Sequence, residues 1–171
     1  MKKLILFAIS LALLLSGCVS PDGTGNFMLY LTDKPIDNAE EIWVTISEIN
    51  VQKENEGFIT LWSGESGEKT YDLLKLRFIE EKIVDSTLPE GTYTQIRLVV
   101  DSGRIVINGE PHEMTVPSSE VKIPYVFNVM EEGTTEIVLD FEAEHSIHAV
   151  NAGLSEQYIL RPVIKVKNIR Y

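Results

Sequence analysis

The chain has 171 residues, of which 15 are Lys or Arg, 26 are Asp or Glu and one is Cys. This acidic balance excludes a protein that binds nucleic acid or anionic lipid headgroups through a basic surface. A single cysteine excludes an intrachain disulfide, so hydrophobic burial and strand pairing must stabilise the fold.

The first 17 residues predict a secretory signal. Met1-Lys2-Lys3 is a short positive segment, and residues 4–15 are apolar apart from Ser10. A charged start followed by an apolar core is typical of a signal peptide. The apolar run is shorter than the roughly 20 residues that cross a bilayer. A retained N-terminal helix is the alternative.

The end of that run resembles the lipobox of prokaryotic lipoproteins, in which an apolar residue, a small residue and Gly or Ala precede a Cys. Leu15-Ser16-Gly17-Cys18 matches each position. The resemblance implies that a signal peptidase recognises Leu15, Ser16 and Gly17, cuts before Cys18, and leaves a diacylglyceryl group on the Cys18 sulfur. Two acyl chains, at about 0.8 kcal/mol per buried CH2, would anchor the protein to a membrane. Ordinary secretion with an incidental cysteine is the alternative.

These features divide the chain into a lipoprotein signal peptide at 1–17, a flexible tether at 18–26 and one β domain at 27–171. The expected location is extracytoplasmic, at the cell surface or a periplasmic face. Since Lys2 and Lys3 lie in the signal, the remaining chain keeps 13 basic and 26 acidic residues, a net charge of −13. Its membrane contact is therefore expected to come from the lipid and not from a basic surface.

From Phe27 onward apolar residues recur with the period of two that is typical of β-strands. Residues 27–32 form the first expected strand, which ends at Asp33-Lys34-Pro35. Residues 41–53 form the second. Its apolar positions change parity between Ile46 and Ile49, which predicts a β-bulge near Ser47-Glu48.

The next segments are less regular. Residues 58–62 predict a third strand, and residues 63–68 a loop. Residues 70–76 suit either a short strand or one helical turn, and residues 77–85 are compatible with a helix.

Turn signals organise the middle of the chain. Leu88-Pro89-Glu90-Gly91 predicts a turn that begins a strand running through Asp101. Asp101-Ser102-Gly103 is expected to turn the chain again. Asn108-Gly109 is the strongest hairpin signal in the sequence.

Three further strands are expected at residues 121–129, 134–142 and 158–169. Pro124 lacks a backbone donor, which predicts an edge strand or a bulge there. The expected fold class is all-β: an antiparallel β-sandwich of Greek-key, transthyretin- or immunoglobulin-like type. It should have about eight or nine strands and at most one short helix near residues 73–84.

Seven segments spread along the chain together carry a family resemblance. They are Tyr30-Leu31-Thr32-Asp33-Lys34-Pro35, Val44-Thr45-Ile46-Ser47-Glu48-Ile49, Tyr71-Asp72-Leu73-Leu74, residues 88–98, Leu139-Asp140-Phe141, Ser146-Ile147 and Leu160-Arg161-Pro162-Val163-Ile164. These segments resemble a domain family of unknown function, DUF4382, which occurs in bacterial and archaeal surface proteins and lipoproteins. The resemblance implies a compact extracellular β domain and carries over no catalytic residue. The strand entry at residues 88–93 also resembles that of transthyretin-like and collagen-adhesin B-type sandwiches, which concerns architecture alone.

Acidic residues at expected turns and strand ends form the main candidate site. Carboxylates suit Ca²⁺, which takes 6–8 oxygen ligands. The metal prediction rests on Asp33, Asp101, Asp140 and Glu142, and requires the fold to bring these strand ends together. The alternative is a solvated, charge-rich surface, and Asp33 also suits hydrogen bonding to nearby backbone amides. The wider acidic set adds Asp37 and Glu144.

Other side chains give weaker indications. His112, His145 and His148 invite a zinc interpretation, but no fourth ligand is evident. The loop at 63–70 lacks the spacing of a phosphate-binding loop. No Gly-x-Ser-x-Gly nucleophile motif occurs. Aromatic residues that suit either carbohydrate stacking or core packing are Tyr30, Trp43, Trp62 and Tyr93.

The leading hypothesis is a non-enzymatic, lipid-anchored module that binds a protein, a polysaccharide or a cation, or that serves as envelope structure. A Ca²⁺-dependent binding domain is the second hypothesis, and a hydrolase the third. No other cofactor is expected.

Overall fold

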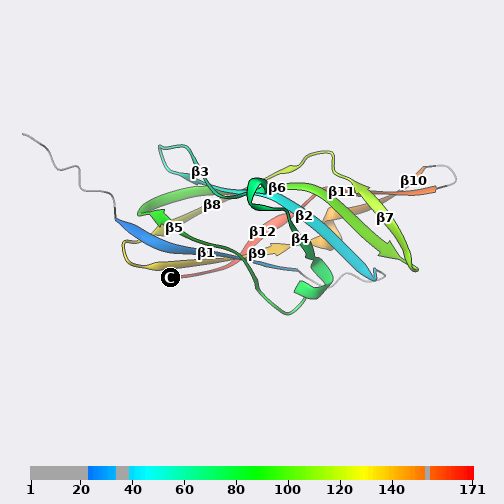
Figure 1. Ribbon diagram of the computed structural model, residues 1–171, viewed down its shortest axis with the longest axis horizontal. Helices are drawn as coiled ribbons and strands as arrows, with labels where there is room; N and C mark the ends of the chain where they lie inside the picture. Colours follow the sequence, from blue (N-terminus) through cyan, green and yellow to red (C-terminus); the bar gives the residue numbers. More distant parts are fainter. Residues whose placement is uncertain (1–22, 34–38, 153–154) are drawn as a thin grey trace, which may run out of the picture.

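The computed structural model describes residues 23–33, 39–152 and 155–171, which form two facing β-sheets (Figure 1). The four-stranded sheet has the order β12-β9-β1-β5, and the eight-stranded sheet contains the path β10-β11-β7-β6-β2-β3, with β4 on β2 and β8 on β6. The elements in chain order are β1 (Thr24–Thr32), β2 (Glu41–Lys53), β3 (Phe58–Ser63), η1 (Gly64–Ser66), β4 (Lys69–Asp72), η2 (Leu73–Leu76), β5 (Glu81–Pro89), β6 (Gly91–Ile107), β7 (Glu110–Thr115), β8 (Glu120–Val129), β9 (Thr134–Phe141), α1 (Ala143–Ser146), β10 (Ile147–Ala152), β11 (Ser155–Leu160) and β12 (Ile164–Arg170).

The all-β sandwich predicted from the sequence is confirmed. The core fills the space between the sheets with the alternating apolar residues of both inner faces. Phe27 of β1 stacks on Phe127 of β8 with ring centroids 5.5 Å apart, and Phe127 stacks on Tyr93 of β6 at 5.2 Å. These three rings join the two sheets through fully buried side chains.

The β-bulge predicted in the second strand is present. β2 pairs with β6, and the register shifts between Ile46 and Glu48. Ile46 on one side of the bulge and Ile49 on the other are both completely buried. The extra residue therefore keeps both halves of β2 facing the core, although the parity of the sequence changes.

Two strand pairings depart from a purely antiparallel sandwich. β1 pairs with β9 in parallel, and β11 pairs with β7 in parallel. The described residues also form 12 strands, more than the eight or nine expected. Parallel neighbours need long crossover connections, which a local sequence pattern does not reveal.

The turn predicted at Asp101-Ser102-Gly103 is wrong. β6 runs through it without ending and continues for 17 residues, to the hairpin at Asn108-Gly109 that was correctly predicted. Asp101 has no register partner on β2, because the register shifts there: Ser102 pairs with Thr45 and Val100 pairs with Ile46. A Cβ atom on Gly103 would lie 2.7 Å from side-chain carbons of Leu160 and Met114. Gly103 therefore allows close packing inside the sandwich and does not form a turn.

The helix considered for residues 77–85 is wrong. Residues 70–76, for which the sequence allowed a short strand or one helical turn, contain both, because β4 is followed by the single helical turn η2. Asp72 caps η2 by accepting a hydrogen bond from the Leu74 amide at 3.2 Å. The chain then forms strand β5, which pairs with β1. Tertiary pairing overrides the local helical compatibility of this segment.

The single strand predicted at 158–169 is also wrong. It is two strands in different sheets, since β11 belongs to the eight-stranded sheet and β12 to the four-stranded one. The break falls at Arg161-Pro162-Val163, where Pro162 cannot donate to a ladder. An apolar alternation continues across the break, so the period alone could not locate it.

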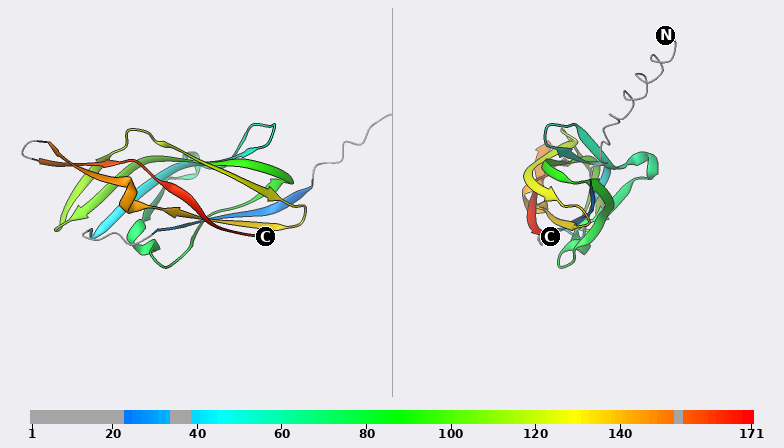
Figure 2. Two further views of the ribbon diagram at one scale, coloured as in Figure 1. Left: turned by 180° about the vertical axis from the view of Figure 1, so that it is seen from behind. Right: turned by 90° about the vertical axis from the view of Figure 1, so that its left-hand side faces the viewer.

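The molecule is elongated, with two different ends (Figure 2). The described chain enters at the end formed by the start of β1, the β5–β6 turn and the β8–β9 turn. The C-terminal Tyr171 lies at this same end, here called the entry end. At the other end, here called the far end, are the β6–β7 and β10–β11 hairpins. Because β6 has 17 residues, it extends about 55 Å between the two ends.

Candidate functional site

Three of the four residues predicted to bind metal lie at the same end of the four-stranded sheet. Thr32 is the register partner of Asp140 in the parallel β1–β9 pair, so Asp33 follows one residue further on, at the level of Phe141. Glu142 follows directly at the end of β9. All three side chains are buried, with exposed fractions of 5% for Asp33, 6% for Asp140 and 7% for Glu142.

Asp101, the fourth predicted ligand, does not join them. It lies on β6 in the other sheet and is exposed. Asp37 lies outside the described residues, and Glu144 is exposed on α1. Within the described ranges, no group of three or more His, Cys, Asp or Glu residues is arranged to hold a metal ion. Ca²⁺ binding by this set stays a prediction.

The three buried carboxylates have protein partners. The Ala143 amide donates to Asp33 Oδ1 at 3.1 Å. Lys165 Nζ lies 2.6 Å from Glu142 Oε2, and Lys165 is also the register partner of Asp140. A buried carboxylate is stable only when it is paired or hydrogen-bonded, and these contacts meet that need.

Two chain crossings between the sheets are joined at the same place. The first leads from β9 through α1 to β10, and the second leads from β11 to β12. The Glu142 amide donates to the Val163 carbonyl at 2.9 Å, and Ser146 Oγ accepts from the Val163 amide at 2.9 Å. We call residues 32–33, 140–146 and 161–165 the crossover node. It gathers residues from four of the segments that carry the family resemblance, and its contacts are structural.

Replacing Asp33 with Ala should therefore destabilise the domain by about 1–3 kcal/mol, because the Ala143 amide would lose its acceptor in a buried place. Urea unfolding monitored by tryptophan fluorescence measures the change. The matched control is Asp101→Ala, which removes an exposed carboxylate and should change the free energy of unfolding by less than about 0.5 kcal/mol. Equal stability of the two variants would contradict the structural role of Asp33.

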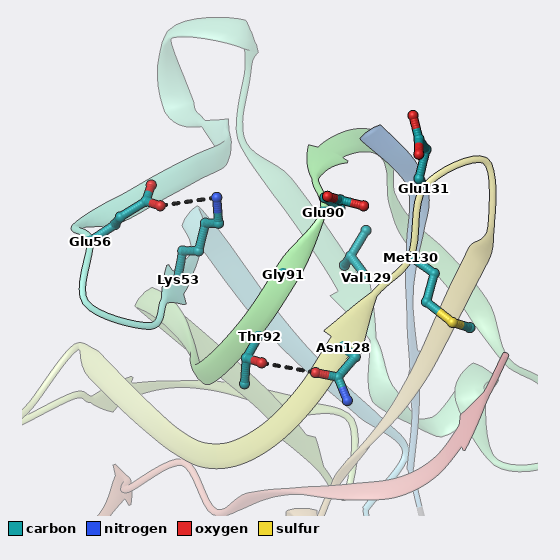
Figure 3. A pocket seen from close by; sticks show the side chains of 9 residues that line it. All are labelled: Lys53, Glu56, Glu90, Gly91, Thr92, Asn128, Val129, Met130 and Glu131. Carbon is teal, nitrogen blue, oxygen red and sulfur yellow. Dashed lines mark hydrogen bonds and ion pairs between the residues drawn. The ribbon is translucent and has the colours of Figure 1, made fainter. Parts of the chain in front are cut away.

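A separate open depression of about 520 Å³ lies at the entry end (Figure 3). Its walls come from the end of β2, the β2–β3 turn, the β5–β6 turn, and the end of β8 with the turn that follows. The lining has three Glu and one Lys and contains no His, Cys or Ser. The lining residues are Lys53, Glu56, Glu90, Gly91, Thr92, Asn128, Val129, Met130 and Glu131.

None of these lining residues was predicted from the sequence as a site residue, and Lys53 is the buried charged residue among them. Its side chain is 10% exposed, and its Nζ pairs with Glu56 Oε1 at 3.0 Å. A Cβ atom on Gly91 would lie 2.9 Å from Lys53 Cε, so glycine leaves room for the lysine stem. Lys53 stands on the same parity as Ile49 and Val51, the buried face of β2. A charged residue at a position where the strand alternation predicts an apolar one is the sequence signal that could have revealed Lys53.

Tyr93 lies beside Lys53 in the β2–β6 register and is completely buried. Its hydroxyl donates to the Pro89 carbonyl at 2.8 Å. Burial, and then the negative charge of Glu56, raises the pKa of Tyr93 to about 12. Tyr93 therefore fixes the β5–β6 turn from inside as a neutral donor and is not part of an exposed aromatic surface.

The other aromatic candidates lie on different strands: Tyr30 on β1 of the four-stranded sheet, and Trp43 and Trp62 on β2 and β3 of the other sheet. Trp43 lies between Lys75 and Arg104, whose charged groups are 5.1 Å and 5.9 Å from its ring centroid. Trp62 packs under Lys69, whose ammonium also donates to the Ile83 carbonyl of β5. Burial lowers the pKa of Lys69. These cation–π contacts cover the ring faces that a sugar would need.

The three histidines lie on different elements. His112 on β7 contacts the Tyr158 ring at 5.0 Å, His145 is on α1, and His148 is on β10. The His145 Nδ1 atom lies 3.8 Å from Glu142 Oε2. No zinc arrangement results among the described residues.

The family model for the domain of unknown function DUF4382 matches residues 24–162. The chain belongs to the DUF4382 family. No curated protein and no solved structure matches the chain. The family match spans β1 through β11 and ends inside the crossover node, so the shared pattern of DUF4382 includes both sheets.

Among the described residues of this DUF4382 protein, no helix is long and apolar enough to cross a membrane. The predicted signal peptide and Cys18 lie outside the described residues. The described part is an elongated sandwich with an acidic depression at the entry end and a projecting hairpin at the far end.

Proposed function

We propose that this DUF4382 protein is a lipid-anchored extracytoplasmic module that is attached at its entry end and binds a partner at its far end. The lipobox Leu15-Ser16-Gly17-Cys18 supports the anchor, with diacylglyceryl on Cys18 as the membrane contact. The partner class is a protein or polysaccharide outside the membrane, and the role is binding rather than catalysis.

The observation that carries the proposal is the attachment of the chain at the entry end. Three backbone hydrogen bonds hold the start of β1: Glu90 N to Gly23 O at 2.7 Å, Asn26 N to Gly133 O at 2.8 Å and Glu132 N to Thr24 O at 2.9 Å. Since β1 begins at Thr24, only five peptide links separate Cys18 from Gly23. That segment can reach at most about 17 Å.

Such an anchor would hold the entry end, with its acidic depression, close to the membrane surface. The far end would then stand up to about 55 Å away, given the 17 residues of β6. A net charge of −13 gives the domain no attraction to anionic headgroups, so its contact with the membrane would come from the lipid alone.

Metabolic labelling with a radioactive or alkyne-bearing fatty acid tests the anchor in the native host. The wild-type chain should take up label and lose residues 1–17, and Cys18→Ser should take up none. The control carries Cys18→Ser together with Ser20→Cys, which restores a cysteine two residues outside the lipobox and should stay unlabelled. Label on Cys18→Ser, or an unlabelled wild-type chain, would refute the lipid anchor.

A further inference from the structure

β10 is an edge strand at the far end of the eight-stranded sheet. One side of it pairs with β11 from Ile147 to Ala152, and it is the last strand in the sheet order. The β10–β11 ribbon projects beyond the sandwich in both side views (Figures 1 and 2). Its side chains His148, Ala149 and Val150 are exposed.

An exposed edge strand offers unpaired N–H and C=O groups to another strand, so proteins protect such edges with charges, Pro or a covering element. The other long edges here are protected. β12 carries Lys165, Lys167 and Arg170, β5 carries Glu81, Lys82 and Asp85, and β8 carries Lys122 and Pro124. The short strand β3 has no charge, but it packs beside β5 of the opposite sheet.

β10 has none of these protections. It contains no Asp, Glu, Lys, Arg or Pro, in a protein whose residues are 24% charged. Its described exposed side chains are His148, Ala149 and Val150, and Val150 is 42% exposed. The edge is therefore suited to strand addition.

We propose that β10 pairs antiparallel with β10 of a second copy of this chain, joining two eight-stranded sheets into one. A second copy fits as the occupant because it presents the same uncharged edge strand. Two chains of net charge −13 repel each other over most of their surfaces, and a strand without charges lets them meet. The pairing is isologous, with the same strand on both sides of a two-fold axis, so it closes as a dimer.

The strand directions set the orientation of the pair. β6 runs from Gly91 at the entry end to Ile107 at the far end, β7 returns, β11 is parallel to β7, and β10 is antiparallel to β11. β10 therefore runs toward the far end. Antiparallel pairing of two copies places their entry ends at opposite ends of the dimer.

On a membrane this geometry joins copies that stand on two facing surfaces, a step that rests on the proposed lipid anchor. The pairing itself does not depend on the anchor. One six-residue strand per copy gives a small contact, so a single pair should be weak. Many copies on each of two surfaces can raise the effective affinity by about 10²–10⁴.

Val150 is the position that tests the pairing. A two-fold axis perpendicular to the joined sheet keeps equivalent residues on one face, so the two Val150 side chains lie opposite or diagonal to each other. Like charges at such positions destabilise a strand pair, and opposite charges stabilise it. Val150→Lys and Val150→Glu should therefore each abolish self-pairing, whereas a mixture of the two should restore it.

The experiment uses the full lipidated chain, purified in detergent and reconstituted into phosphatidylcholine vesicles, with vesicle clustering followed by dynamic light scattering. Wild-type vesicles should cluster. Val150→Lys vesicles alone and Val150→Glu vesicles alone should lose clustering at least tenfold, and an equal mixture should recover it. The matched control is Val126→Lys, at an exposed position on β8, which should cluster like the wild type.

Each outcome decides one of the two proposals. Co-flotation of the chain with vesicles measures the anchor separately, and a chain that does not float refutes the anchor. In that case the pairing is measured by light scattering of the concentrated chain in detergent. A wild-type chain that floats but does not cluster vesicles overturns the pairing. So does a mixture of Lys and Glu vesicles that fails to recover, which would indicate a different partner for β10.

Discussion

Replacing Gly25 with Ala should destabilise the domain by about 3 kcal/mol or more, because the added methyl group has no room. Gly25 is buried in β1, and a Cβ atom there would lie 2.2 Å from the Met130 carbonyl oxygen and 2.9 Å from a Val129 side-chain carbon. The nearest atom belongs to the backbone, so no side-chain rotation relieves the clash. The β8–β9 turn would have to move away from β1.

Urea unfolding of the purified chain, followed by the fluorescence of Trp43 and Trp62, measures this loss. Gly57→Ala is the matched control, since a Cβ atom on that exposed glycine meets nothing within 4 Å. Its free energy of unfolding should stay within about 0.5 kcal/mol of the wild type. If Gly25→Ala unfolds at the same urea concentration as Gly57→Ala, Gly25 does not lie close to the Met130 carbonyl at the entry end.

The second large effect is expected at the centre of the core. Replacing Phe127 with Ala should cost about 3–5 kcal/mol, since it removes a fully buried ring and leaves a cavity. Phe127 stacks on Phe27 in the other sheet and on Tyr93 in its own, so both sheets lose their shared aromatic contact. Thermal unfolding measured by far-ultraviolet circular dichroism should show a lower midpoint.

The neighbouring residue supplies the control for that prediction. Val126 is 67% exposed on the opposite face of β8, and Val126→Ala should leave the midpoint nearly unchanged. Similar losses for the two variants would mean that β8 does not direct Phe127 into the core.

The segments that resemble the DUF4382 family build structural features of this chain. They supply residues of the crossover node and of the inner faces of both sheets. The family match covers residues 24–162 and so includes the far-end strand β10.

The candidate site illustrates what a local pattern can and cannot predict. The sequence suggested that Asp33 would bind backbone amides near it in the chain. The amide it binds belongs to Ala143, 110 residues away. Only the parallel pairing of β1 with β9 creates that contact, and no period in the sequence encodes which strands become neighbours.

The sequence by itself determined the class of fold, most strand positions, the bulge in β2 and the hairpin at Asn108-Gly109. These follow from side-chain alternation and turn chemistry, which act over a few residues. Only the tertiary structure decided that β6 passes through Asp101-Ser102-Gly103, that residues 81–89 form a strand, and that residues 158–169 divide between two sheets. It also decided that Asp33, Asp140 and Glu142 lie at one end of the four-stranded sheet while Asp101 lies on the other sheet. Each of these depends on which distant strand supplies the hydrogen-bond partner, and that choice is made by the packing of the whole core.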